Sequence, residues 1–139
     1  MNRPRFHLAF PVRDIEATRH FFVELLGCKA GREAARWIDF DFYGHQVSAH
    51  LVDENETTAH NTVDDRKVPV RHFGLIIEWD QWERLAERLR AANVDFLIEP
   101  YVRFANEPGE QGTFFVKDPS GNALEFKTFR QEQDIFRRD

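Results

Sequence analysis

The sequence is poor in the features that mark secreted, membrane-spanning and nucleic-acid-binding proteins. Its single cysteine, Cys28, excludes an internal disulfide bond and is interpreted as a small buried residue. No apolar run approaches the length that crosses a membrane, and residues 1–5 lack the apolar core of a signal peptide. A net charge of -5 gives no reason to expect nucleic-acid binding. We therefore expect a cytoplasmic protein that binds neither nucleic acid nor membranes.

The composition that remains is that of a folded globular chain. Of the 139 residues, 42% are hydrophobic and 31% are charged, which suits one compact domain with a real core. The 14 phenylalanines are many for this length and predict an aromatic-rich interior or cavity. We expect residues 1–139 to form a single domain.

The first half of the chain predicts one strand, one helix and three further strands. Residues 6–12 alternate between apolar and other side chains with the period of a half-buried strand. Asp14 is placed to cap a following helix, and Gly27 supplies its stop. The three further strands are expected at residues 29–32, 37–43 and 46–52.

The second half repeats this order after a polar stretch. Residues 53–67 have no hydrophobic period, so we interpret them as a linker between the halves. The elements expected after it are a strand at 71–78, a helix at about 80–92, strands at 94–103, 113–117 and 122–129, a turn at 118–121 and a short helix in the tail. The predicted fold class is α+β, with two βαβββ modules at about residues 5–52 and 70–129 and a linker at 53–69.

Four residues that bind metals well lie at what we interpret as matching points of the two halves. His7 and His72 open the first strand of each half, whereas His50 and Glu125 lie in the last one. Because side chains alternate across a strand, parity places all four on the sheet face that is turned away from the helix. Two imidazoles and a carboxylate on rigid strands, with coordination positions left open, suit a catalytic divalent metal such as iron(II).

Small residues accompany the four candidates on that face. They are Ala9, Ser48, Gly74 and Ala123. A packed sheet face normally carries larger side chains, because voids cost stability. The pattern therefore predicts room for a metal, water and a small ligand.

Three segments carry a resemblance to a known family. They read His-Leu-Ala-Phe-Pro-Val-Arg-Asp (7–14), His-Phe-Gly (72–74) and Asp-Pro-Ser-Gly-Asn-Ala-Leu-Glu-Phe (118–126). With the repeated order of elements, they resemble the vicinal oxygen chelate superfamily, which includes glyoxalase I, extradiol dioxygenases, fosfomycin-resistance transferases and bleomycin-resistance proteins. The resemblance covers residues 6–129 and is greatest to bacterial single-domain proteins described as predicted extradiol-type dioxygenases.

This resemblance implies curved mixed sheets wrapped around a metal cleft. It implies that His7, His72 and Glu125 are the metal ligands. His50 falls where glyoxalase I has a carboxylate ligand and where the dioxygenases have an acid–base histidine. We assign it as catalytic, while the role of fourth ligand stays open. Phe115 stands where the dioxygenases usually carry a tyrosine, and this departure speaks against ordinary catechol cleavage.

The stretch before the last two strands supplies the candidates for substrate binding. Arg103 is predicted to bind a carboxylate or phosphate, because its planar fork suits such anions. Glu107 and Gln111 are expected at the mouth of the cleft, and Phe115 is expected to line it. The alternative is a solvated loop with an ordinary ion pair.

Together these features predict a metal-dependent enzyme, extradiol dioxygenase-like, that acts on a small oxygen-chelating substrate. The expected cofactor is Fe(II), with Mn, Ni or Zn as alternatives, and dioxygen as a further reactant if the metal is iron. The alternative functions are a glyoxalase-like isomerase or lyase, a resistance-type transferase, or a protein that sequesters a small molecule. Members of the superfamily pair their halves within one chain or across a dimer, and by this analogy we expect a homodimer.

Overall fold

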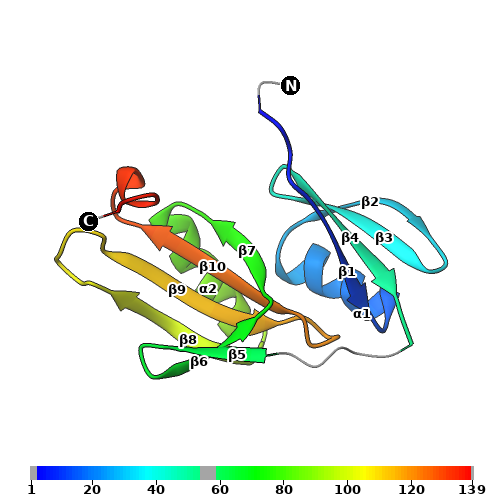
Figure 1. The fold of residues 1–139 in the computed structure, drawn as a ribbon. Coiled ribbons are helices and arrows are strands. Elements are labelled where there is room, and N and C mark those ends of the chain that lie inside the picture. Colours follow the sequence, from blue (N-terminus) through cyan, green and yellow to red (C-terminus); the bar gives the residue numbers. More distant parts are fainter. Residues whose placement is uncertain (1–2, 54–58, 139) are drawn as a thin grey trace. The chain divides into compact units, whose positions relative to one another are not determined.

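A computed structural model of the chain describes residues 3–53 and 59–138 (Figure 1). The chain forms two compact units: unit 1 comprises Met1–Thr57 and Asp118–Asn122, and unit 2 comprises Thr58–Lys117 and Ala123–Asp139. Each unit contains a 4-stranded mixed sheet and a helix, which confirms the α+β class. None of the helices in the described residues is both long enough and apolar enough to cross a membrane.

Unit 1 follows the predicted order of strand, helix and three strands. Its elements are β1 (His7–Val12), α1 (Ile15–Arg19), the π-helical turn η1 (His20–Leu25), β2 (Lys29–Ala34), β3 (Trp37–Phe42) and β4 (His45–Leu51). The sheet order is β1-β4-β3-β2, with β1 parallel to β4 and the other neighbours antiparallel. The ribbon shows α1 and η1 on one face of this sheet (Figure 1).

The helix-side face of this sheet forms the core of unit 1, as the alternation predicts. Phe10 and Val12 of β1 are buried, whereas His7 and Ala9 are exposed. The Phe22 ring of η1 stacks on Phe40 of β3, with ring centroids 4.8 Å apart. Phe6, which we expected on the buried face, precedes β1 and is 61% exposed, so that prediction is wrong.

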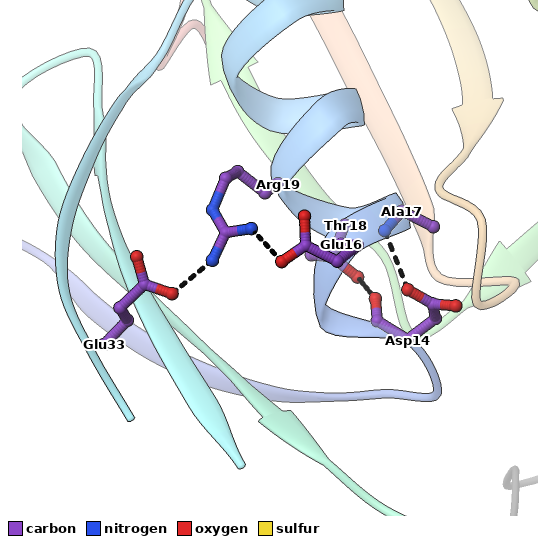
Figure 2. Close-up of polar contacts among 6 residues, drawn as sticks. All are labelled: Asp14, Glu16, Ala17, Thr18, Arg19 and Glu33. Carbon is purple, nitrogen blue, oxygen red and sulfur yellow. Dashed lines mark hydrogen bonds and ion pairs between the residues drawn. The ribbon is translucent and has the colours of Figure 1, made fainter. Parts of the chain in front are cut away.

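Local polar contacts fix the start of α1 (Figure 2). Asp14 is the N-cap as predicted: its Oδ1 accepts a hydrogen bond of 2.8 Å from the Ala17 amide, which satisfies a free donor of the first turn. The hydroxyl of Thr18 donates to the Asp14 carbonyl oxygen. Arg19 pairs with both Glu16 and Glu33, and thereby ties the helix to β2.

The turn at residues 118–122 belongs to unit 1, although it lies far along the chain from the rest of that unit. The Asp118 carboxylate accepts hydrogen bonds from the Ser120 and Asn122 amides, which closes the predicted turn. The Asn122 side chain donates to the Pro11 carbonyl oxygen at 2.7 Å, and the Arg13 amide donates to the Ser120 hydroxyl at 2.8 Å. Residues 118–122 therefore satisfy polar groups of the main chain at the end of β1.

Unit 2 repeats the design of unit 1 and adds a hairpin. Its elements are β5 (Ala59–Val63), β6 (Arg66–Val70), β7 (Phe73–Ile76), α2 (Trp79–Ala91), β8 (Phe96–Arg103), β9 (Gln111–Lys117), β10 (Ala123–Phe129) and the short 3-10 helix η2 (Glu132–Asp134). The main sheet has the order β7-β10-β9-β8, with β7 parallel to β10, and β5 pairs with β6 in a separate sheet. The helix expected at about 80–92 is α2, and it buries Trp82, Leu85, Ala86 and Leu89.

Two predictions for this half need correction. The predicted linker contains the β5–β6 hairpin, whose turn is made by Asp64 and Asp65 with φ of 51° and 60°, the left-handed pair that tight hairpins require. Residues 54–58 of that linker lie outside the described residues. The strand expected at 71–78 is only Phe73–Ile76, so His72 immediately precedes the strand instead of opening it.

Cys28 is buried in unit 1, as predicted. Burial raises the pKa of its thiol to about 12, and the nearby Asp41 carboxylate adds to this effect. We expect the native protein to leave a thiol reagent unconsumed at mildly alkaline pH, because the thiolate is the reacting species. Absorbance measurements with Ellman's reagent should then find one reactive thiol per chain after unfolding in guanidinium. Rapid reaction of the native protein would contradict this burial.

Candidate metal centre

His72 and Glu125 form a close pair in unit 2. The Nε2 atom of His72 lies 3.1 Å from Oε1 of Glu125. The Glu125 side chain is mostly shielded, with 14% exposed, whereas 29% of the His72 side chain is exposed. The pairing of Gly74 with Glu125 places β7 beside β10 and brings the residue before β7 within reach of the carboxylate.

A main-chain carbonyl fixes the tautomer of His72. Its Nδ1 lies 2.6 Å from the carbonyl oxygen of Pro69, at the end of the β5–β6 hairpin. A carbonyl oxygen only accepts hydrogen bonds, so Nδ1 carries a proton. The Nε2 lone pair of a neutral His72 would then face the Glu125 carboxylate, which also only accepts. This arrangement calls for a cation at Nε2, which is either a proton or a metal ion.

The second oxygen of Glu125 is held by Thr113. The Thr113 hydroxyl, on the neighbouring strand β9, donates to Glu125 Oε2. Thr113 is only 4% exposed, so this contact is shielded from water. Sequence reasoning missed Thr113, although it shares the parity of Phe115 and so had to lie on the same face of β9.

The pKa values of the pair shift in opposite directions. The hydrogen bond with Glu125 raises the pKa of His72; burial opposes this rise and the Pro69 carbonyl reinforces it. Burial alone would raise the pKa of Glu125, but its hydrogen bonds with His72 and Thr113 outweigh burial and leave the pKa lowered. The carboxylate therefore stays ionised near neutral pH and is available as a ligand.

Phe115 lies against this pair. It faces Glu125 across the β9–β10 ladder, and its ring centroid is 4.9 Å from that of His72, edge to face. The side chain is only 3% exposed and carries no polar group. Phe115 therefore excludes water from one side of the pair and supplies no proton.

Gly74 is small for a reason other than the one the sequence suggested. A Cβ atom added there would lie 1.6 Å from the carbonyl oxygen of Glu125, far inside any van der Waals contact. Gly74 thus permits the close approach of β7 to the main chain of β10. Glu125 can take its observed position because Gly74 has no side chain. Gly74 is therefore not evidence of space for a ligand.

The register of the two sheets corrects the predicted matching of His50 with Glu125. Ala9 pairs with Ser48 in unit 1, just as Gly74 pairs with Glu125 in unit 2. The equivalent of Glu125 in unit 1 is therefore Ser48. Its hydroxyl donates to Oδ1 of Asp39 at 2.5 Å.

His7 and His50 lie on one face of the unit 1 sheet, but at different levels. His7 pairs with Gln46, whereas His50 pairs with Pro11, four positions further along β4. At about 3.3 Å per residue, His50 is roughly 13 Å from the level of His7 along the strand. Two imidazoles that project from the same sheet face at that separation cannot both bind one metal ion. His50 is therefore not a co-ligand of a metal bound by His7.

The predicted substrate-binding residues divide into three places in unit 2. Phe115 adjoins the His72–Glu125 pair. Arg103 and Gln111 face each other at the other end of the β8–β9 ladder, four positions from Phe115 along β9. Glu107 is exposed in the loop between β8 and β9, where its amide donates to the Phe104 carbonyl oxygen.

The residues present fit a divalent ion through their chemistry. Across the part of the chain that the structure describes, no group of three or more His, Cys, Asp or Glu side chains could hold a metal. Unit 2 supplies one imidazole and one carboxylate, oriented by Pro69 and Thr113. Open positions beside such a donor set are typical of catalytic ions.

Comparison with known proteins agrees with the fold. A crystal structure of a glyoxalase/bleomycin resistance protein/dioxygenase from Alicyclobacillus acidocaldarius is 31% identical, with a TM-score of 0.79, over 98% of this chain and 100% of that chain. An integron cassette protein from V. cholerae is 26% identical, with a TM-score of 0.61, over 92% and 96% of the two chains. A fosfomycin resistance protein from Listeria monocytogenes is 14% identical and shares the fold, with a TM-score of 0.71 over 96% and 98%.

The search of curated proteins finds no match. The family model of the glyoxalase/bleomycin resistance protein/dioxygenase superfamily matches residues 6–126, which is most of the chain. The protein therefore belongs to the glyoxalase/bleomycin resistance protein/dioxygenase superfamily.

Proposed function

We propose that the protein is a metal-dependent enzyme that acts on a small substrate through two neighbouring oxygen atoms, with extradiol dioxygenase-like chemistry. Members of its superfamily generally use a divalent metal, and the superfamily includes many enzymes. The observation that carries the proposal is the His72–Glu125 pair, in which the imidazole Nε2 and the carboxylate lie 3.1 Å apart and call for a cation.

The proposed ligands are His7, His72 and Glu125, and Fe(II) is the proposed ion. A bound divalent ion would act as a Lewis acid that holds two substrate oxygens and lowers the pKa of one of them. The protein's own part is to position its donors. Pro69 keeps the His72 proton on Nδ1, and Thr113 holds the second oxygen of Glu125. Phe115 keeps water away from one side of the pair.

The first experiment is the metal content of protein purified without oxygen or chelator. About one iron per chain would support the proposal and justify a screen of catechols, related vicinal diols and hydroxy acids. Zinc or nickel would favour the isomerase or transferase chemistry found elsewhere in the superfamily. A protein that neither contains a metal nor takes up iron(II), manganese or zinc would sink the proposal and favour a binding protein.

His50 is proposed to act as an acid–base group, since histidine is the side chain that most often transfers protons in enzymes. We expect His50→Ala to leave the metal content unchanged, because His50 and His7 stand at different levels of the sheet. On a substrate found by the screen, the turnover rate should fall by about 100-fold or more. The matched control is His20→Ala, which removes an exposed histidine from η1. A loss of bound metal in His50→Ala alone would return His50 to the role of ligand.

A further inference from the structure

The turn of the β5–β6 hairpin presents a carboxylate to two side chains of β8. Oδ2 of Asp64 lies 2.7 Å from Nε of Arg103, and it accepts a hydrogen bond of 3.0 Å from the Tyr101 hydroxyl. Arg66 places its guanidinium over the Tyr101 ring, 3.8 Å from the centroid, and donates to the Asp64 carbonyl oxygen. One guanidinium group and one hydroxyl therefore contact the carboxylate, while Arg66 holds the Asp64 main chain and the Tyr101 ring.

Asp64 is an imperfect partner for Arg103. The Nε atom of Arg103 is buried, but it makes no hydrogen bond although the Asp64 oxygen is near. A buried donor that is left unsatisfied costs free energy, which an acceptor in the correct direction would recover. Across residues 3–53 and 59–138, Asp64 is the one carboxylate that pairs with Arg103. The Arg103 guanidinium has the fork geometry that makes two-point contacts with carboxylate and phosphate anions.

The cluster lies on the sheet face that carries the candidate metal centre. Tyr101 pairs with Thr113, and Arg103 pairs with Gln111, so these side chains share a face. Thr113 in turn donates to Glu125. The side chains of Glu125 on β10, Thr113 on β9 and Tyr101 on β8 therefore lie on the same face of the sheet.

We propose that Asp64 is an internal occupant of an anion-binding subsite formed by Arg103 and Tyr101. A carboxylate or phosphate group of the ligand displaces it, and the hairpin turn moves away as the ligand binds. The exchange replaces one anion with another, so Arg103 keeps a counter-ion throughout. The inference rests on the proposed function in one respect, namely that the ligand binds on this face of the sheet. It adds that the substrate of the proposed enzyme carries a negative charge.

The test uses metal-free, full-length protein, so that its failure is distinct from failure of the metal proposal. Asp64→Asn removes the charge but keeps the turn, because asparagine tolerates a positive φ. The matched control is Asp65→Asn, which makes the same charge change at the adjacent turn residue, also left-handed and exposed. Inorganic phosphate and acetate are the two probes, and their affinities are measured by NMR titration.

We expect Asp64→Asn to bind one or both probes up to about fivefold more tightly than the wild type, since a partly exposed ion pair competes by at most about that factor. Asp65→Asn should bind like the wild type. Adding Arg103→Gln to Asp64→Asn should abolish the gain. The preferred probe then distinguishes a phosphate-bearing from a carboxylate-bearing ligand. An equal gain in both single variants, no gain in either, or a gain that survives Arg103→Gln would overturn the proposal.

Discussion

Replacing Gly74 with alanine is expected to lower the free energy of unfolding by at least about 3 kcal/mol. The added Cβ would lie 1.6 Å from the Glu125 carbonyl oxygen, which belongs to the main chain and cannot rotate away. Relief requires β7 to separate from β10, and that movement breaks the parallel ladder between them. Overpacking that forces the main chain to shift costs stability.

Gly31→Ala provides the matched control for this effect. Gly31 also lies in a strand, β2, but the nearest atom to an added Cβ would be the Asp39 Cβ at 3.4 Å. We expect its unfolding free energy to stay within about 0.5 kcal/mol of the wild type. Urea unfolding followed by circular dichroism measures both variants. If Gly74→Ala unfolds at the same urea concentration as Gly31→Ala, the close approach of β7 to β10 is wrong.

Removing the Glu125 carboxylate should produce the largest loss of metal binding. We expect Glu125→Gln to weaken Fe(II) binding by at least about 100-fold, because loss of a ligand should exceed the 10- to 100-fold effect of an outer-shell change. The amide retains the shape of the side chain and can still accept from Thr113. The fold should therefore survive, and the loss should appear in anaerobic equilibrium dialysis with Fe(II).

Two further variants complete this experiment. Glu99→Gln makes the same chemical change at an exposed glutamate of β8 that pairs with Arg90, and it should bind Fe(II) normally. His72→Ala should lose binding as Glu125→Gln does, because it removes the other half of the pair. Normal Fe(II) affinity in both His72→Ala and Glu125→Gln would show that the pair is a structural ion pair and that the proposed centre is wrong.

The fold could be predicted well wherever local signals and the hydrophobic pattern agreed. Alternation in residues 6–12 identified β1 and its buried face, and Asp14 identified the start of α1. The composition of residues 118–121 identified the turn that Asp118 closes. The β5–β6 hairpin escaped prediction because its stretch has no hydrophobic period. Its turn is instead held by polar contacts from Asp64 to residues of β8, which lie far away in the sequence.

For the candidate site, the sequence predicted only which face of the sheet carries each residue. Parity correctly grouped His7 with His50, because side chains alternate whatever the register. Parity does not determine the level along a strand, because a shift of two residues leaves every side chain on the same face. For that reason, the sequence alone made His50 the counterpart of Glu125, whereas the ladder makes it Ser48. Thr113 contacts Glu125 and Pro69 contacts His72, and no sequence motif predicts either contact.

The five residues Asp118–Asn122 bear on any attempt to divide the protein into independently expressed fragments. They interrupt the sequence of unit 2, yet they complete unit 1 by satisfying Pro11 and Arg13. A gene fragment that stops at residue 57 would encode the first βαβββ repeat without these partners, leaving the end of β1 uncapped. The boundary between the two sequence repeats is therefore not a position at which the chain can be divided into two complete units.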